Sequence, residues 1–215
     1  MGHMVSTARI PRSAVGEDSP SKGQVTRQGV LDAAVARFGR DGFRATSVAD
    51  IAREASVGGT VPYAYFASKE DLFLSALDLD ASAVIGEGLS IVFDQPDRGT
   101  WRRDLMFTLV AEVDRHPLAR RVLAGLEPDV TDRVVDIPAL RELRVAVAER
   151  LAAEQKTGGV RPDIDPVVLG SGVVSIILSL LMSTVQLGER VTATYARDVI
   201  AVIEAAIDPT STAPA

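Results

Sequence analysis

A stretch of 23 residues, Ser47 to Lys69, limits most tightly how this chain can fold, and its sequence is SVADIAREASVGGTVPYAYFASK. Ser47 can cap a first short helix, since its hydroxyl can accept a backbone N–H and Asp50, three residues on, favours the positive helix N-terminus. The turn at 56–59 carries two glycines, and residues 60–66 suffice for about two turns of a second helix. The stretch therefore predicts two short helices joined by a tight turn, the helix-turn-helix shape.

Pro62 lies inside the second of these helices and limits where that helix can begin. A proline in a helix interior costs about 3 kcal/mol, but in the first turn its missing N–H would have no intrahelical partner. We therefore expect the second helix to start at Gly58 or Gly59, so that Pro62 falls near its beginning.

The rest of the chain has helical periodicity and no sustained strand alternation. Residues 24–41 carry one apolar face, and Gly42 can supply the left-handed residue that ends their helix. Ser68 can cap a helix that runs to about Phe93. Further helices are predicted over residues 100–115, 118–126, 138–156 and 166–188, with a last one ending at Pro209. These patterns predict an all-α fold of about nine helices.

The two ends of the chain lack any apolar period. Residues 1–23 are rich in Ser, Gly and Pro, and Gly2-His3-Met4 resembles the remnant of an expression tag. Residues 209–215 follow the last helical pattern and are expected to fray. We therefore expect a disordered arm at 1–23, a helical head at 24–69, a larger helical body at 70–208 and a disordered tail.

Charge separates the head from the body. Residues 1–69 hold nine Lys or Arg and six Asp or Glu, a balance of +3, so the total of -6 leaves -9 for residues 70–215. A mildly basic head on an acidic body suits a protein of which only the head meets a polyanion. No charged-then-apolar leader opens the chain, so we expect it in the cytoplasm.

Composition argues against an enzyme. With no cysteine and only two histidines, the chain offers no thiolate site and no imidazole cluster for a metal. No nucleophile elbow, phosphate loop or metal-ligand spacing stands out in the body, and His116, before Pro117 at a helix end, fits a cap better than a general base. We predict no catalytic residue, no metal and no cofactor.

The segment from Val167 to Leu187 has 21 residues without a charge, which is long enough to span a bilayer. Ser171, Ser175, Ser179 and Ser183 recur every four residues, and such a ridge of small side chains lets another helix approach closely. The segment also lacks a basic flank and an aromatic belt. We therefore expect a helix buried between its own body and a partner subunit. Membrane attachment is the alternative, and a need for detergent would support it.

Three phrases of the head resemble the DNA-binding domain of the TetR family of bacterial transcriptional regulators. They are VLDAAVARFGRDGF, ATSVADIA, and Tyr63-Ala64-Tyr65-Phe66 followed by Ser68-Lys69-Glu70 and Leu72. They lie between Arg27 and Phe73, whereas the body matches no individual motif. The resemblance implies a three-helix helix-turn-helix DNA-binding domain on a larger ligand-binding and dimerisation domain, whose last two helices pair across a two-fold axis.

Position in the family motif implies which residues meet DNA. Phosphate contacts fall to Ser47, Tyr63 and Lys69, and Tyr65 fits either a phosphate contact or the core. Base and groove contacts fall to Ala49, Gly59, Thr60, Val61 and Ala64. None of these five has the bidentate fork that reads guanine or adenine, so readout is expected to use thymine methyls, one hydroxyl and DNA shape.

The chain departs from the family pattern around the turn, with Ser56 where glycine is usual and Pro62 where leucine is usual. These departures leave the identity of the base-reading residues open. With such small readers, one head should discriminate weakly, so we expect two heads to bind a palindromic operator together.

The resemblance, with a body too large for dimerisation alone, also implies a small-molecule effector. The candidate pocket residues are Phe93, Trp101, Met106, Phe107 and Met182, although each alone also fits ordinary core. We expect an apolar or aromatic effector that changes DNA affinity by favouring one spacing of the heads. The expected dimer interface comprises Ser171, Ser175, Ser179, Val199, Val202 and Ile203.

These inferences together predict a ligand-responsive repressor that binds double-stranded DNA as a homodimer. The alternative is a helical small-molecule-binding or scaffold protein whose degenerate head does not bind DNA. Binding to the DNA that flanks its own gene would separate the two.

Overall fold

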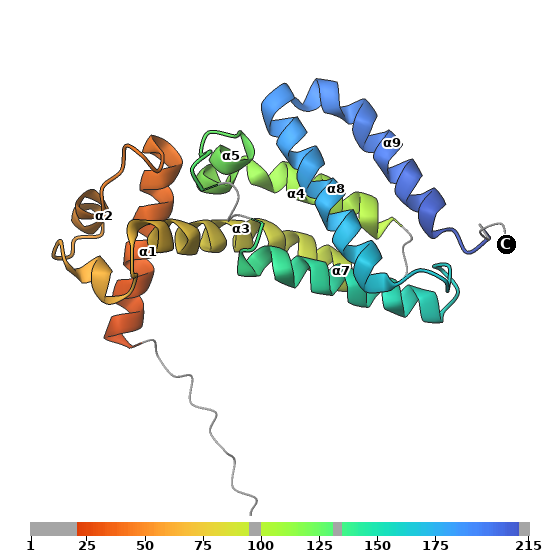
Figure 1. Cartoon of the computed structure of the whole chain (residues 1–215), viewed down its shortest axis with the longest axis horizontal. Helices are drawn as coiled ribbons and strands as arrows, with labels where there is room; N and C mark the ends of the chain where they lie inside the picture. Colours follow the sequence, from red (N-terminus) through yellow and green to blue (C-terminus); the bar gives the residue numbers. More distant parts are fainter. Residues whose placement is uncertain (1–20, 95–99, 131–134, 211–215) are drawn as a thin grey trace, which may run out of the picture.

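The computed structural model describes residues 21–94, 100–130 and 135–210. Within these ranges the chain forms eight α-helices and one 3-10 helix, with no strand (Figure 1). The elements are α1 Lys22–Asp41, α2 Val48–Glu54, η1 Val61–Ala64, α3 Lys69–Asp94, α4 Trp101–Val113, α5 Pro117–Leu123, α7 Pro138–Lys156, α8 Pro166–Leu187 and α9 Glu189–Ile207. The predicted all-α fold is confirmed.

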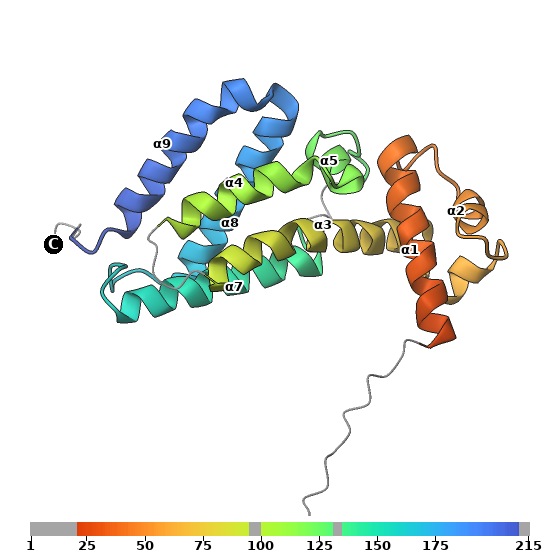
Figure 2. The ribbon, with the colours of Figure 1, turned by 180° about the vertical axis from the view of Figure 1, so that it is seen from behind.

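The long helix α3 joins the head to the body. Its start contacts α1, and further along it contacts α4 and α7 (Figure 1). Figure 2, from behind, shows α1 and α2 gathered at one end of the molecule and α9 at the opposite, outer side. The boundary expected between residues 69 and 70 therefore falls at the first residue of a helix that contacts both parts.

Helix α1 begins earlier than predicted because Ser21 forms a complete capping box with Gln24. Gln24 N donates to Ser21 Oγ at 3.3 Å, and Ser21 N donates to Gln24 Oε1 at 2.7 Å. The helix consequently starts at Lys22, inside the arm expected at 1–23. The rest of that arm, with its tag remnant, and the end of the expected tail lie outside the described residues.

The head has a small aromatic core. Gly42 ends α1 with φ 87°, as predicted, and lets Phe43 fold back onto the helix. The ring centroids of Phe38 and Phe43 lie 6.1 Å apart, and those of Phe43 and Phe73 lie 5.3 Å apart. These contacts fasten the start of α3 to the end of α1.

The second helix of the helix-turn-helix is shorter than predicted. Instead of two turns beginning at Gly58 or Gly59, one 3-10 turn covers Val61–Ala64. Pro62 does lie in the first turn of this helix, but the turn starts at Val61. The preceding turn takes its left-handed conformation at Ser56, with φ 56°, and not at either glycine. The predicted start was wrong because the chain changes direction at Ser56, and neither glycine adopts a positive φ before the helix.

Helix α8 is buried on one side only within the chain. It is long and apolar enough to cross a membrane, with a mean hydropathy of 2.1, yet only 33% of the apolar window is buried. Its outer side exposes Val167, Val168 and Ile176. One face of α8 is therefore buried against the body of its own chain, as expected. Its other apolar face is uncovered in the single chain.

Candidate DNA-binding surface and effector cavity

Ser47 stands exposed at the N-terminus of α2 and is paired with Asp50. Its Oγ accepts from Asp50 N at 3.1 Å and donates to Asp50 Oδ2 at 2.6 Å, and Arg53 donates to the same carboxylate at 2.8 Å. The Ser47 hydroxyl first, and Arg53 second, hold the pKa of Asp50 below its ordinary value. The expected cap is present, and Asp50 returns its bond to the hydroxyl, not to the Ser47 backbone N–H.

The residues predicted to meet the bases and groove lie around η1 and the exposed side of α2. Tyr63 has 57% of its surface exposed, and it stands on η1 beside them. Ala49, Gly59, Thr60 and Ala64 are exposed, and Val61 is half-buried. The structure therefore brings the predicted set to one end of the head, with Val61 the least accessible member.

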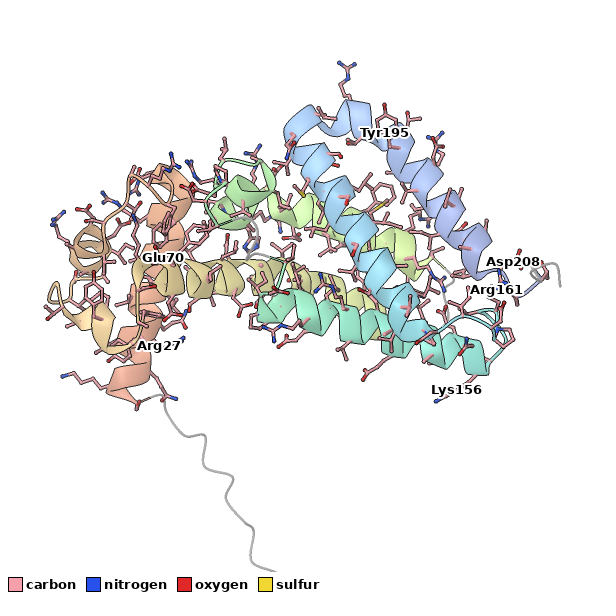
Figure 3. All side chains as sticks on the ribbon, in the orientation of Figure 1. Arg27, Glu70, Lys156, Arg161, Tyr195 and Asp208 are labelled. Atoms are coloured by element: carbon pink, nitrogen blue, oxygen red, sulfur yellow. The ribbon has the colours of Figure 1, made fainter. Side chains whose placement is uncertain are left out.

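Two cations of the head lie over aromatic rings. Lys69, the first residue of α3, places Nζ 4.4 Å from the ring centroid of Phe43. Arg27, labelled in Figure 3, places Cζ 5.2 Å from the ring centroid of Phe66. Tyr65 is half-buried against the core, so both of its predicted roles stay open. Arg27 was not singled out from the sequence, because one arginine on a helix carries no pattern.

Most arginines of the head are neutralised by carboxylates. Arg37 and Arg40 both contact Asp41, at 3.0 and 3.1 Å. Arg44 donates to Asp129 at 2.7 Å. In the described part of the head, the cations without an ion pair are Lys22, Arg27 and Lys69. The slight basic excess of the head is therefore concentrated in few side chains.

A central cavity of about 70 Å³ lies between α3, α4, α5, α7 and α8. All the residues on its wall are apolar, and they include Leu77, Leu109, Val122, Leu140 and Ile177, one from each helix. Such a wall can bind hydrocarbon by the hydrophobic effect but can offer no side-chain hydrogen bond.

Four of the predicted pocket residues, Trp101, Met106, Phe107 and Met182, do not lie on this wall. Trp101 is fully buried and its Nε1 donates to Glu154 Oε1 at 2.6 Å, which anchors α4 to α7. Met106 and Phe107 instead line an open groove between α4, α8 and α9. Met182 is half-buried on α8, and the side chain of Phe93 lies outside the described residues. The sequence does not single out the wall of the central cavity, because apolar residues at helical spacing are equally typical of a filled core.

Helix α5 contacts both the cavity and the head. Its Ala119 and Val122 lie on the cavity wall. On the other side α5 packs on α1 so closely that a Cβ added at Gly39 would lie 2.9 Å from Pro117 Cβ. Asp80 of α3 fixes the start of α5, since its Oδ2 accepts from two backbone N–H groups there at 2.9 Å. A displacement of α5 would therefore reach both parts.

The loop after α5 fastens the head to the body. Glu127 is buried, and its two carboxylate oxygens accept from Phe43 N at 3.1 and 3.2 Å. The same carboxylate pairs with Arg121 of α5. Because Phe43 begins the link from α1 to α2, Glu127 joins the helix-turn-helix to the helix that lines the cavity.

The predicted interface residues fall mostly on the outer side of α8 and α9. Ser171, Ser175 and Ser179 are exposed, Val199 is half-buried, and Val202 has 66% of its surface exposed. Tyr195 also stands on the outside of α9 (Figure 3). Ile203 is the exception: it is 8% exposed and packs into the chain's own core, because the inner stripe of α9 also holds Ala196 and Ile207.

Comparison with known proteins agrees with this architecture. Residues 30–76 match the family described as bacterial regulatory proteins, tetR family. A comparison with curated protein sequences finds no match. The head is therefore a TetR-family helix-turn-helix domain, and the predicted resemblance is confirmed.

Solved structures match over most of the chain. A TetR-family transcriptional regulator from Pectobacterium atrosepticum has a TM-score of 0.70 at 15% identity, covering 88% of this chain and 97% of that chain. The transcriptional regulator FadR from Bacillus subtilis, in complex with stearoyl-CoA, has a TM-score of 0.65 at 16% identity, with 84% and 98% covered. FadR from Thermus thermophilus, a TetR-family repressor in complex with lauroyl-CoA, has a TM-score of 0.65 at 21% identity, with 88% and 98% covered. The chain as a whole has the fold of the TetR-family transcriptional regulators.

Proposed function

We propose that this protein is a cytoplasmic, ligand-responsive transcriptional repressor that binds a palindromic operator as a homodimer and is released by an apolar effector. The observation that carries the proposal is the double contact of α5, which lines an apolar cavity on one side and packs on the DNA-binding head on the other. We assign the protein no catalytic role.

The DNA contacts proposed for the head follow from its exposed residues. Ser47, Tyr63 and Lys69 contact phosphates, with Arg27 as an added cation beside η1. Groove contacts come from Ala49 of α2 and from residues in and just before η1, namely Gly59, Thr60, Val61 and Ala64. With few free cations and small readers, each head binds weakly, and affinity depends on two heads held at a fixed spacing.

The uncovered face of α8 and α9 supports the homodimer. Its exposed apolar side chains are flanked by exposed serines whose hydroxyls donate to their own helix; the hydroxyl of Ser175, for example, donates to the carbonyl of Ser171 at 2.9 Å. A second copy can then approach without leaving these hydroxyls unpaired. Sedimentation of the full chain at micromolar concentration tests this step, and a purely monomeric protein would contradict it.

The effector proposed here carries a hydrocarbon part. The cavity wall is apolar throughout, and the two FadR neighbours were solved with fatty acyl-CoA molecules. A cavity of about 70 Å³ has room for roughly five water-sized groups, so a longer chain must push its walls apart. Movement of α5 would pass through Glu127 to the head and change the spacing of the two recognition elements.

The DNA part of the proposal is tested by selecting bound duplexes from a random pool. A palindromic sequence should emerge, with half-sites about 34 Å apart or a multiple of that distance. Lys69→Ala should then weaken binding to every duplex, and it should lower the slope of log affinity against log salt by about 2 per dimer, one phosphate contact per head. Lys156→Ala is the matched control, since Lys156 lies at the far end of α7 (Figure 3).

The outcome of this selection also decides between the two candidate functions. If no duplex is enriched over the pool while the folded protein binds apolar compounds, the protein is a helical small-molecule-binding protein without DNA recognition. If Lys69→Ala and Lys156→Ala bind DNA equally well, the phosphate contact assigned to Lys69 is wrong. If DNA binds but no apolar compound releases it, the regulation by effector is wrong.

A further inference from the structure

Arg102 is a buried cation at the start of α4, on the side of the body away from the head. Its side chain is 8% exposed. The guanidinium Cζ lies 4.8 Å from the ring centroid of Trp101, and Nη2 pairs with the carboxylate of Glu154 on α7. Glu154 also accepts from Trp101 Nε1 and from Arg150 Nε, so its charge is shared by three donors. The Glu154 carboxylate is therefore satisfied by Arg102 Nη2, Trp101 Nε1 and Arg150 Nε, without Arg102 Nε.

The Nε atom of Arg102 is not used in this arrangement. It is buried, and no acceptor in the described part of the chain lies within hydrogen-bonding reach. Buried donors without an acceptor are rare, because the group loses its water and regains no hydrogen bond. A ligand atom at this position would remove that penalty.

Arg102 lines a small second cavity. This space of about 10 Å³ is otherwise bounded by apolar side chains and Glu204, including Met106, Val173 and Ile203. It is about the size of a single water or one oxygen-bearing group. Ile177 lies on its wall and also on the wall of the central cavity. The two cavities therefore share a wall residue, and Ile177 stands between the central cavity and the space that Arg102 lines.

The charges around Arg102 select the kind of oxygen that fits. Burial lowers the pKa of Arg102 below its ordinary value, while Glu154 and Glu204 oppose this effect and Arg150 adds to it. An incoming carboxylate would meet two carboxylates that already balance the two arginines. A neutral carbonyl oxygen needs one N–H donor and brings no charge into an apolar site.

We propose that Arg102 Nε recognises the effector, and that the effector is an uncharged, largely hydrocarbon molecule with one carbonyl oxygen, such as a ketone or an ester. The inference rests on the proposed function for the role of effector, but the binding event itself requires no DNA. The hydrocarbon occupies the central cavity, and displacement of the Ile177 side chain lets the oxygen reach Arg102. The apolar wall supplies affinity, and the single donor supplies selectivity.

The chain contains its own probe for this site. Trp101 is the only tryptophan, and its ring lies against Arg102. Its fluorescence in the full-length protein should therefore change saturably when the oxygen of 2-nonanone binds. Calorimetry gives the affinities independently. We expect the wild-type protein to bind 2-nonanone at least several-fold more tightly than nonanoate. The affinity for n-hexane, which has no oxygen, should not depend on whether Arg102 is present.

Two conservative variants isolate the donor. Arg102→Lys keeps a cation for Glu154 but removes Nε, whereas Arg150→Lys makes the same change at a second partner of Glu154 that does not line the cavity. Arg102→Lys should weaken 2-nonanone binding by about tenfold, the effect of one hydrogen bond to a charged group. Arg150→Lys should leave it within about twofold, and n-hexane should bind all three proteins alike.

The proposal is overturned if Arg102→Lys and Arg150→Lys bind 2-nonanone equally, if nonanoate binds the wild-type protein better than the ketone, or if the wild-type protein binds none of the probes. Should Arg102→Lys fail to fold, the wild-type preference between ketone and carboxylate still decides. A ketone that binds through Arg102 without releasing DNA would contradict the proposed regulation and leave the assignment of this site intact.

Discussion

Glu127 offers the sharpest test of how the head is fastened to the body. The substitution Glu127→Gln keeps the shape of a side chain that is 5% exposed but removes its charge. The carboxylate accepts from Phe43 N with both oxygens, at 3.1 and 3.2 Å, and pairs with Arg121. A glutamine amide has one oxygen instead of two. Its NH2 group is itself a donor and would face Phe43 N or Arg121, which are also donors. The loss of one buried charge-assisted hydrogen bond should lower the free energy of unfolding by about 2–3 kcal/mol.

Asp129→Asn in the same loop is the matched control. Asp129 pairs with Arg44, but their side chains are 40% and 77% exposed, so the pair is solvated on both sides. Exposed ion pairs contribute little to stability because water screens them, so Asp129→Asn should cost much less than Glu127→Gln. Both variants replace a carboxylate by an amide, so the difference between their losses in the free energy of unfolding reports the effect of burial.

Urea unfolding followed by two signals gives the measurement. Far-ultraviolet circular dichroism reports all helices, whereas the fluorescence of Trp101 reports only the body. In Glu127→Gln the circular dichroism transition should begin at lower urea than the fluorescence transition, because the head loses its attachment first. Equal losses in Glu127→Gln and Asp129→Asn, or coincident transitions with a loss under about 0.5 kcal/mol, would refute this account of Glu127.

Two further predictions concern the helix-turn-helix itself. Ser56→Gly should raise the free energy of unfolding by about 0.5–1 kcal/mol, since Ser56 has φ 56° and glycine adopts that conformation without a steric penalty; the urea midpoint measures it, and Ser56→Ala should show no gain. Asp50→Asn should lower the melting temperature at pH 7 but not in acid. The pKa of Asp50 is depressed by Ser47 and Arg53, so its contribution is present above the unfolded pKa, near 4, and disappears as pH falls through the lower folded pKa. Calorimetry at pH 7 and at the lowest pH where both proteins fold checks this, and a deficit that persists in acid would contradict it.

Local signals predicted the elements whose ends are set by nearby residues. Helix α7 runs from Pro138 to Lys156, the range that its apolar spacing predicted. Gly42 ends α1, and Ser68 caps α3 through a bond to Asp71 N at 3.1 Å. In these cases the donor, the acceptor and the residue with the required backbone conformation lie within a few positions of one another. The local sequence pattern is therefore enough to predict where the helix begins or ends.

The candidate DNA-binding surface of the head was predictable in part. The motif placed Tyr63, Thr60 and Ala64 on an exposed surface, where the structure has them. It did not show that η1 would be a single 3-10 turn, nor that Lys69 would lie against Phe43. Both depend on how the turn at Ser56 and the ring of Phe43 pack against neighbouring segments.

Local patterns in the chain were enough to predict an all-α fold, a helix-turn-helix head that precedes a larger body, and apolar surface on the last helices. The position of the apolar cavity and the attachment of the head to the body depend instead on contacts between segments far apart in the chain. Glu127 meets Phe43 across 84 residues of sequence, and Arg102 meets Glu154 across 52. The cavity wall comes from five helices. Periodicity identifies the buried face of each helix, but the space left between the faces, and the charges buried there, depend on how all of them pack together.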